Sequence, residues 1–363
     1  MRIGLDARML TYSGIGTYLR GLLSGLLSLS GKESYVLFGK DEETRGYLRD
    51  GKSQTLTWNA GPYDPFSPWL HPMKGRNLDL FHCPHYNLPY GIKGPSVITI
   101  HDLIHLVCPD LLTDRRAHWY ASWMLPSAAR RATHILTVSE YSKQEILRHL
   151  KVSEIKVTVI YHGVEEAFHP LSKVEVESFR VAHRLPERFL LYVGMLKPHK
   201  NIVRLVQAFS CLNLDGVSLL LVGKRDSRYR ELDMILEEEA LHKNIIFLSS
   251  IPFEELPLIY NAAESLILPS LYEGFGLPAL EAMACGTPVV CSQAASLPEV
   301  VGDAAVLADP LSVRSIVEGM KKSLEDSALR SELRRKGLER AKQFRWRDSA
   351  AKTLSVYHEV AKK

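Results

Sequence analysis

Short runs of apolar, often β-branched residues alternate along the chain with longer stretches that are apolar on one helical face only. Buried parallel strands and the helices that cover them produce this alternation. The first half predicts strands at 2–6, 34–38, 79–82, 96–100, 134–138 and 157–160, and helices at 15–29, 115–132 and 140–150. The second half predicts strands at 189–193, 217–222, 245–248, 265–268, 288–291 and 304–307, helices between them, and a helical tail from 312. The pattern indicates an α/β fold with two open parallel sheets.

Turn-forming and charged residues replace the strand signal over residues 165–188. A chain of 363 residues is also long enough for two ordinary domains. We therefore predict domains at 1–170 and 171–345, followed by a last helix at 346–363. In open α/β sheets a ligand lies beyond the carboxyl ends of the strands, so we expect the active site in a cleft between the two sheets.

The composition, 46% hydrophobic and 24% charged, is that of a folded chain rather than a disordered one. A net charge of +4, spread along the sequence, is too weak to indicate a nucleic-acid partner. Met1 leads directly into the strand-like RIGLDAR without a signal peptide, and five irregularly spaced cysteines are typical of reduced thiols. We expect a cytoplasmic protein whose membrane contact, if any, is peripheral at the inner face.

Two strand-to-helix junctions carry residues suited to phosphate. In TYSGIGTYLRGLL (11–23), Gly14 and Gly16 precede a helix, and glycines there let backbone N–H groups approach an anion. A tight turn explains the same glycines, so both interpretations stay open. In YVGMLKPHKN (192–201), Lys197, His199 and Lys200 follow Gly194, and they either offset phosphate charge or form a solvated basic turn.

The stretch EGFGLPALEAMACGTPVV (273–290) predicts a helix over 278–285, because Pro278 suits a first helical turn and Gly286 a helix end. Gly274 and Gly276 clear space for backbone amides at its positive end. Glu281 lies one turn inside the helix, and Glu273 lies in the loop ahead of it. Carboxylates accept hydrogen bonds from paired hydroxyls, so two of them around a phosphate cradle suggest a nucleotide sugar. A capping acid and a surface charge are the alternative.

These motifs, together with TIHDLIHL, LTVSEYSKQEI, VIYHGVEEAFHP and SLPEVVGDAA, resemble glycosyltransferase family 4 over nearly the whole chain. Members of that family are retaining enzymes with the GT-B fold. The resemblance implies two Rossmann-like domains facing across a cleft, an acceptor-binding first domain, a nucleotide-sugar-binding second domain and a C-terminal helix that crosses back to the first. It also implies hexosyl transfer in bacterial surface polysaccharide, lipopolysaccharide or glycolipid synthesis.

The resemblance also assigns site residues. Glu273 would contact the donor sugar, Lys200 the diphosphate and His101 the region near the donor sugar, and these three are the catalytic candidates. The other nucleotide-sugar contacts that it implies are Gly14, Gly16, Gly274, Phe275, Gly276, Leu277 and Glu281. The family is generally thought to react on one face of the sugar, with the leaving phosphate helping to remove the acceptor proton.

The donor and the cofactors follow from finer features. Many family members have Arg where this chain has Met195, and Lys197 or His199 would supply the missing charge. GMLKPHKN is similar to the segment in bacterial mannosyltransferases, which favours GDP-mannose over a UDP-sugar. The chain has no Asp-x-Asp, so we expect no metal and no other cofactor. HDLIH (101–105) resembles a zinc motif only if it is helical, and it reads instead as the end of a strand.

The acceptor is expected to be a saccharide or lipid-linked saccharide bound by loops 61–74 and 85–94 of the first domain. In RRAHWYASWMLPSAARR (115–131), arginines flank Trp119, Tyr120 and Trp123, a combination suited to a lipid interface. A buried helix with solvated ends explains that segment equally well. The rival functions are a GT-B-shaped nucleotide-sugar epimerase and a catalytically idle nucleotide-sugar-binding subunit.

Overall fold

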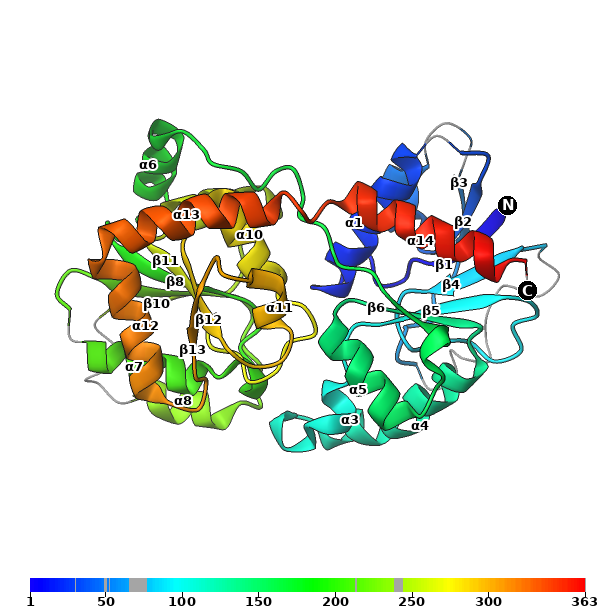
Figure 1. Cartoon of the computed structure of the whole chain (residues 1–363), viewed down its shortest axis with the longest axis horizontal. Helices are drawn as coiled ribbons and strands as arrows, with labels where there is room; N and C mark the ends of the chain where they lie inside the picture. Colours follow the sequence, from blue (N-terminus) through cyan, green and yellow to red (C-terminus); the bar gives the residue numbers. More distant parts are fainter. Residues whose placement is uncertain are drawn as a thin grey trace. The chain divides into compact units, whose positions relative to one another are not determined.

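A computed structural model (Figure 1) describes residues 1–29, 31–48, 51, 53–64, 77–212, 214–237 and 244–362. The chain divides into two compact units. Unit 1 comprises Met1–Val107, His118–Gly163 and Phe344–Lys363, and unit 2 comprises Cys108–Ala117 and Val164–Gln343. The sequence placed divisions after residues 170 and 345, whereas the units change after Gly163 and Gln343.

Unit 1 is built on a seven-stranded sheet in the order β3-β2-β1-β4-β5-β6-β7, in which every pairing is parallel. The order reverses between β1 and β4, so the chain winds away from this point in both directions. The strands are β1 (Arg2–Asp6), β2 (Ser34–Gly39), β3 (Ser53–Thr57), β4 (Leu80–Cys83), β5 (Ser96–Ile100), β6 (His134–Thr137) and β7 (Val157–Val159).

Unit 2 repeats the plan with a six-stranded parallel sheet in the order β10-β9-β8-β11-β12-β13. Here the order reverses between β8 and β11. The strands are β8 (Phe189–Val193), β9 (Ser218–Val222), β10 (Ile245–Leu248), β11 (Ser265–Leu268), β12 (Val289–Ser292) and β13 (Val306–Ala308). Their central strands are fully buried, which explains their unbroken apolar sequences.

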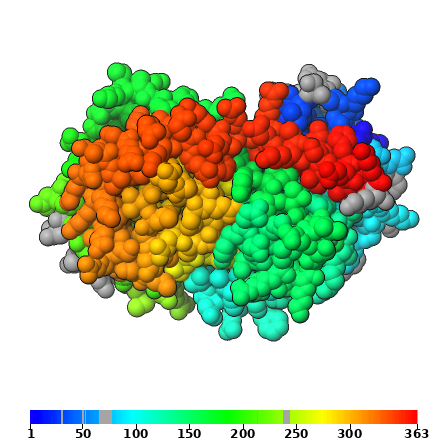
Figure 2. Space-filling view, viewed as in Figure 1, coloured from blue at the N-terminus to red at the C-terminus, as the bar shows by residue number. Residues whose placement is uncertain are grey.

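Helices cover the sheets of both units. In unit 2, Figure 2 shows the residues of α12 and α13, in orange, at the surface. The helices are α1 (Ile15–Ser28), α2 (Asp41–Thr44), α3 (Ile104–Val107), α4 (Arg115–Arg131), α5 (Glu140–Leu150), α6 (Lys173–Ala182), α7 (Ile202–Leu212), α8 (Arg230–Glu237), α9 (Leu256–Ala262), α10 (Leu277–Cys285), α11 (Leu297–Val301), α12 (Val313–Glu325), α13 (Ser327–Ala341) and α14 (Trp346–Val360).

The sequence prediction missed helix α6 and strand β3, as well as the four-residue helices α2 and α3. Residues 165–188 were interpreted as a turn-rich connection, but they contain helix α6. Only Phe179 of α6 is buried, so the helix shows little of the apolar face by which buried helices are recognised. Strand β3 was also missed, because four of the five residues of SQTLT are polar and none of the five is buried at this edge of the sheet.

Helix α14 packs against α1 within unit 1, and two glycines of α1 make the approach possible. A Cβ atom added at Gly21 would lie 2.1 Å from Cε2 of Trp346, and one at Gly25 would lie 2.7 Å from Cβ of Ala350. Trp346 itself is almost fully buried. The chain end is thus anchored in unit 1 by a tryptophan ring lying on a glycine.

We expect Gly21→Ala to destabilise unit 1 by about 1–3 kcal/mol, because an added methyl group must displace a buried indole ring. Gly46→Ala is the matched control, since a Cβ atom there has no atom within 4 Å. Urea unfolding followed by tryptophan fluorescence measures the effect, and unit 2 contains no tryptophan to obscure it. Equal stability of the two variants would show that α14 does not depend on this contact.

Buried histidines connect the strands of unit 1 to its helices. His82 lies 2.5 Å from the Tyr357 hydroxyl through Nδ1 and 2.8 Å from the Thr99 hydroxyl through Nε2. Burial, and secondarily His101, lowers the pKa of His82 to about 3. Burial also lowers the pKa of His85, His101 and His162. All four histidines are therefore neutral in the folded chain near neutral pH.

The free energy of unfolding of unit 1 should consequently fall as the solution is acidified below pH 6.5. The unfolded histidines take up protons around pH 6.5, whereas folded His82 remains neutral down to about pH 3. Each such histidine removes up to about 1.4 kcal/mol per pH unit within this window. Urea midpoints at pH 7.5 and 5.5, followed by tryptophan fluorescence, test the prediction. A midpoint that is unchanged or higher at pH 5.5 would contradict it.

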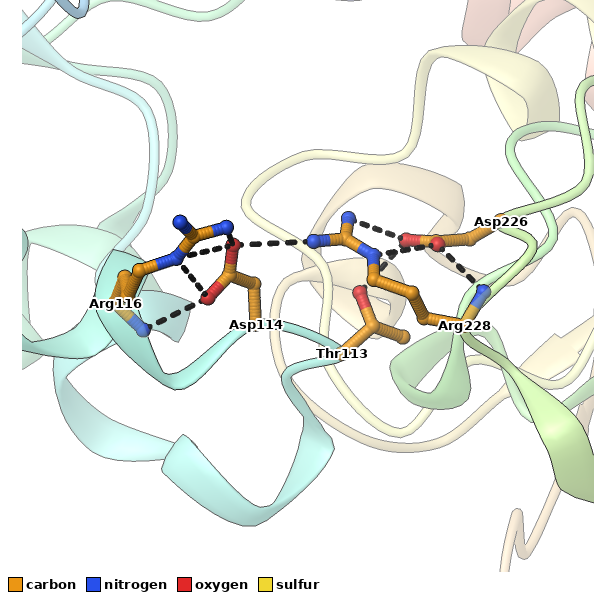
Figure 3. Close-up of polar contacts among 5 residues, drawn as sticks. All are labelled: Thr113, Asp114, Arg116, Asp226 and Arg228. Carbon is orange, nitrogen blue, oxygen red and sulfur yellow. Dashed lines mark hydrogen bonds and ion pairs between the residues drawn. The ribbon is translucent and has the colours of Figure 1, made fainter.

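Residues Cys108–Ala117 belong to unit 2 although unit 1 flanks them in the sequence. Figure 3 shows how this segment meets the loop after β9: Thr113 Oγ1 donates to Asp226 Oδ2 over 2.6 Å, and Arg228 Nη1 reaches Asp114 Oδ2 at 3.1 Å. The hydrogen bond from the Arg228 guanidinium holds the pKa of Asp226 below its ordinary value, and Asp226 is well shielded from solvent. The ionised carboxylate of Asp226 therefore anchors the segment on unit 2.

Candidate active site

The reversal of strand order in unit 2 lies between β8 and β11, where the loops that follow these strands diverge. Crevices outside the carboxyl ends of such neighbouring strands bind ligands in open α/β sheets. Lys200 comes from the loop after β8, and Glu273 comes from the loop after β11. Lys200 Nζ lies 2.6 Å from Glu273 Oε1. Two residues 73 positions apart thus form an ion pair where the fold would place a ligand.

The Glu273 carboxylate is tightly held. Its Oε1 also accepts a hydrogen bond from the Ser270 hydroxyl over 2.8 Å. The side chains of Lys200 and Glu273 are 18% and 9% exposed, so the pair remains partly accessible to a ligand. A charge-assisted hydrogen bond this short fixes both side chains before any ligand arrives.

The two loops are also joined through their backbones. The amide of Leu271, between Ser270 and Glu273 in the sequence, donates to the carbonyl of His199 over 2.8 Å. On the β8 side, the buried Tyr192 hydroxyl donates to the carbonyl of Met195 over 3.2 Å, and the Met195 side chain is exposed. Lys197 and His199 are half-buried in the same loop. The replacement of a missing arginine charge by either of them stays a prediction.

Helix α10 begins immediately after this loop. Gly276 precedes it with φ +106°, a conformation that favours glycine, and a Cβ atom there would lie 2.5 Å from Cδ2 of Leu297. Pro278 occupies the first turn and Gly286 ends the helix with φ +77°, as the sequence predicts. The observed bounds begin one residue earlier than predicted. The amino-terminal, positive end of this buried helix therefore directly adjoins the loop that carries Glu273.

Ser296 holds the loop in this shape. Its hydroxyl, which is fully buried, lies 2.9 Å from the carbonyl oxygen of Glu273 and 3.1 Å from that of Phe275. One hydroxyl that contacts two carbonyl groups of a loop fixes the planes of the peptide groups to which these carbonyls belong. Ser296 therefore sets the orientation of the Gly274 and Gly276 amides, which lie next to these carbonyls in the chain.

For the nucleotide-sugar donor that the sequence resemblance implies, we expect Ser296→Ala to lower kcat/KM about tenfold, because misaligned backbone N–H groups stabilise developing charge poorly. Ser323→Ala is the control, since it removes a buried hydroxyl of the same unit that donates to Met320 in α12. Steady-state kinetics with both variants measure the difference. A comparable loss in the two variants would indicate general destabilisation rather than an effect on the loop.

Glu281, in α10, is buried and accepts a hydrogen bond at Oε2 from the Tyr260 hydroxyl over 2.7 Å. Burial, and then the charge of Glu281, raises the pKa of Tyr260 well above its ordinary value. Tyr260 therefore remains protonated and keeps donating to this carboxylate. No sequence motif predicts this partner, which lies 21 residues upstream in α9.

The remaining predicted site residues lie in unit 1. Gly14 precedes α1 with φ +68°, and Gly16 lies inside the first turn of the helix. The amide of Gly16 already donates to the Tyr12 carbonyl over 2.8 Å, and a Cβ atom at Gly16 would lie 2.6 Å from the Leu10 carbonyl oxygen. Close approach of the backbone therefore explains Gly16 without a ligand.

His101 follows the end of β5, and its ring contacts Tyr18 of α1 at a centroid distance of 4.8 Å. Its Nε2–H donates to the carbonyl of Pro84 over 3.0 Å, since a carbonyl can only accept. Burial lowers the pKa of His101, which leaves the imidazole neutral. The structure thus groups His101 with α1 in unit 1, and it groups Lys200, Glu273 and Glu281 in unit 2.

The zinc-like motif HDLIH does not form a helix. His101 follows β5, whereas His105 lies in the four-residue helix α3. Within the described ranges, no cluster of three or more His, Cys, Asp or Glu side chains is arranged to hold a metal ion. The two histidines therefore lie on different elements, and the helical spacing that a zinc site needs is missing.

A cavity of about 310 Å³ lies at the opposite, amino-terminal edge of the unit 2 sheet. Arg330 and Arg334 line it, but Arg330 pairs with Glu264 at 2.7 Å, and Arg334 reaches the Gly286 carbonyl at the end of α10. Cations at a helix carboxyl end offset its dipole. These arginines therefore have a structural explanation.

Comparisons with known proteins agree with this architecture. Residues 12–168 match the family described as Glycosyltransferase Family 4, and residues 174–342 match Glycosyl transferases group 1. The solved structure of sucrose-phosphate synthase from Thermosynechococcus elongatus superposes with a TM-score of 0.80 at 22% identity, covering 99% of this chain and 98% of that one. The two Rossmann-like parallel sheets thus define a GT-B fold.

Relatives in sequence are more specific. The O-antigen chain mannosyltransferase B of Escherichia coli is 36% identical over 77% of this chain and 74% of its own length. The serotype-specific mannosyltransferase WbdA of Escherichia coli is 30% identical over 72% of this chain, which spans about a third of that protein, 33% of its length. The chain belongs to glycosyltransferase family 4.

Sequence reasoning missed Ser270, Ser296 and Tyr260. The two serines act through hydroxyl groups, and serines of this kind are common in any loop. Tyr260 lies in a short helix with no motif around it. A signal existed only for Ser296, which stands immediately before the Leu-Pro that opens α11, where serine commonly precedes a helix.

Proposed function

We propose that this glycosyltransferase moves mannose from GDP-mannose to a hydroxyl of a saccharide or lipid-linked saccharide acceptor in bacterial surface polysaccharide, lipopolysaccharide or glycolipid synthesis. The observation that carries the proposal is the Lys200–Glu273 pair at the point where strand order reverses in unit 2. Its ammonium group suits a diphosphate, and its carboxylate suits sugar hydroxyls. The names of the two sequence relatives favour mannose as the sugar.

In the proposed reaction, Lys200 and the amides at the start of α10 stabilise the departing diphosphate. Glu273 orients the sugar and Glu281 binds the ribose. Neutral His101, Gly14 and Gly16 belong to unit 1, and their assignment to the donor is supported by the resemblance alone. Transfer retains the anomeric configuration and needs neither a metal ion nor another cofactor. The leaving phosphate helps to take the acceptor proton on the same face.

Product analysis tests this proposal. The chain is incubated with GDP-mannose, and in parallel with UDP-glucose, in the presence of a mannose-terminated lipid-linked saccharide. We expect a mannosylated product from GDP-mannose, an α-anomer by NMR, and unchanged rates in EDTA. Conversion of the donor alone would indicate an epimerase, and binding without turnover would indicate an idle subunit. Faster transfer from UDP-glucose would replace GDP-mannose as the donor.

Helix α4 offers a surface for the predicted peripheral membrane contact. Trp119 and Trp123, four residues apart on one face, are 72% and 49% exposed, and Arg130 is exposed further along the helix. The sequence of α4 contains no acidic residue. Exposed indole rings beside arginines favour the headgroup region of an anionic bilayer. No helix in the described part of the chain is long and apolar enough to span a bilayer.

We propose that this face of α4 binds anionic lipid surfaces, which would bring the enzyme to a lipid-linked acceptor. Flotation with vesicles containing phosphatidylglycerol should recover the chain, and Trp119→Ala/Trp123→Ala should reduce the recovered fraction. Recovery that is equal for the two proteins, or absent for both, would reject the surface.

The described part of loop 61–74 ends at Asp64, so the predicted acceptor contacts of residues 65–74 lie outside the described residues.

A further inference from the structure

The residue after Lys200 joins three loops of unit 2. Asn201 is 2% exposed, and its Nδ2 donates to the carbonyl of Pro269 over 2.9 Å and to that of Pro310 over 2.7 Å. Pro269 directly follows β11, and Pro310 lies two residues beyond β13. One side-chain amide therefore connects the loop that carries Lys200 to the loop that carries Glu273, and both to the edge of the sheet.

Every hydrogen-bonding group of this side chain is used. An asparagine amide offers two N–H groups and one oxygen, and here the oxygen accepts from Arg204 Nη1 over 2.9 Å. The backbone N–H of Asn201 donates to the Pro198 carbonyl over 2.9 Å, and its carbonyl accepts from the Leu205 amide at the start of α7. A buried amide with all its partners holds its surroundings rigidly.

The backbone at this position restricts which residues can stand there. Asn201 has φ +62°, a left-handed conformation that glycine and asparagine tolerate best. Glycine would keep the conformation and lose the cross-link. Aspartate would keep the shape but present a carboxylate to two carbonyl oxygens. Asparagine alone among these three residues combines the conformation with two donors.

We propose that Asn201 is a positioning residue for glycosyl transfer, and that it acts by fixing Lys200. A lysine ammonium stands on a flexible four-carbon stem, so the point it reaches depends on how firmly its backbone is held. Asn201 ties that backbone to Pro269, which precedes Ser270 by one residue and Glu273 by four. Glu273 is the residue that pairs with Lys200. The ammonium group is consequently held in the position from which it contacts Glu273 and, in the proposed reaction, the diphosphate of the donor.

This inference rests on the proposed function, and a double-mutant cycle tests it. Asn201→Gly, Lys200→Met and the double variant are compared with the wild type in kcat and KM for GDP-mannose. Asn201→Gly should lower kcat/KM about 10- to 100-fold, mostly in kcat, because misplacing a catalytic group by about 1 Å can cost up to about 100-fold. In the Lys200→Met background the same change should cost less than about threefold, because coupled residues do not add.

Controls separate positioning from stability. Ser265→Ala removes a buried hydroxyl that donates to the Pro288 carbonyl over 2.9 Å at the amino-terminal ends of the strands of the same sheet. This change should leave kcat/KM within about twofold. If Asn201→Gly does not fold, Asn201→Ser, which retains one donor, enters the same cycle with an expected loss of about fivefold.

The outcomes are distinguishable. The role of Asn201 would be overturned if Asn201→Gly lowered kcat/KM by the same factor in the Lys200→Met background as in the wild type. It would also be overturned if Asn201→Gly caused no loss in the wild-type background. Absence of transfer by the wild-type chain would instead reject the proposed function.

Discussion

Replacing Glu273 with glutamine should lower kcat at least about a hundredfold while leaving the chain folded. The amide can still accept from Ser270, so the local packing is kept. It loses the negative charge that now pairs with Lys200 and, in the proposed reaction, orients the donor hydroxyls. Steady-state kinetics and the melting temperature of the purified variant measure the two parts of this expectation.

Glu264→Gln is the matched control for Glu273→Gln. Glu264 is also a paired carboxylate of unit 2, held by Arg188 at 3.1 Å and Arg330 at 2.7 Å, but it stands at the amino-terminal edge of the sheet. The same change of charge there should leave kcat within about threefold of the wild type. If Glu273→Gln retained full activity, the assignment of Glu273 as a catalytic residue would be wrong.

Lys200→Met should be as damaging, with a loss of about a hundredfold in kcat/KM for the donor. Methionine keeps most of the length of the side chain but removes the charge that would meet the diphosphate. It also leaves the Glu273 carboxylate, 9% exposed, without its cation. Binding of GDP should weaken together with catalysis, which calorimetric titration of the variant with GDP can measure.

Lys336→Met provides the comparison. Lys336 pairs with Asp303 and Glu332 at 2.9 Å on the outer helix α13, so its removal changes the net charge of unit 2 equally without touching the site. GDP affinity within about twofold of the wild type is expected for this variant. If both substitutions weakened GDP binding equally, the affinity would depend on the overall charge of unit 2, and Lys200 would make no contact with GDP.

Most of the fold could be predicted from the sequence, because buried parallel strands have uniformly apolar sequences. The strands around residues 189–193 and 265–268 coincide with β8 and β11, whose residues are all buried. Pro278 and Gly286 marked the ends of α10 to within one residue. These signals are local, and local signals can be read from one chain.

Elements that bury little were harder to predict. Helix α6 has only Phe179 buried, yet it begins with a capping box, in which the Ser172 hydroxyl accepts from the Glu175 amide and the Glu175 carboxylate accepts in return. Ser-Lys-Val-Glu was therefore a readable start signal. The polar edge strand β3 offered no comparable sign.

The site was predicted in part. Lys200, Glu273 and Glu281 stood out by residue type and by resemblance, but their partners did not. The hydroxyls of Tyr260 and Ser296 and the amide of Asn201 meet groups 21 to 109 positions away. Only the pairing order of the strands brings such groups together, and a periodic pattern contains no information about that order.

The central claim is that unit 2 binds a sugar diphosphate at the carboxyl ends of β8 and β11. A crystal structure of the chain soaked with GDP-mannose tests it most directly. The diphosphate should lie against Lys200 and the first turn of α10, with Glu281 at the ribose hydroxyls and Glu273 at the mannose. Donor density elsewhere on the chain, or both glutamates turned away from it, would contradict the claim.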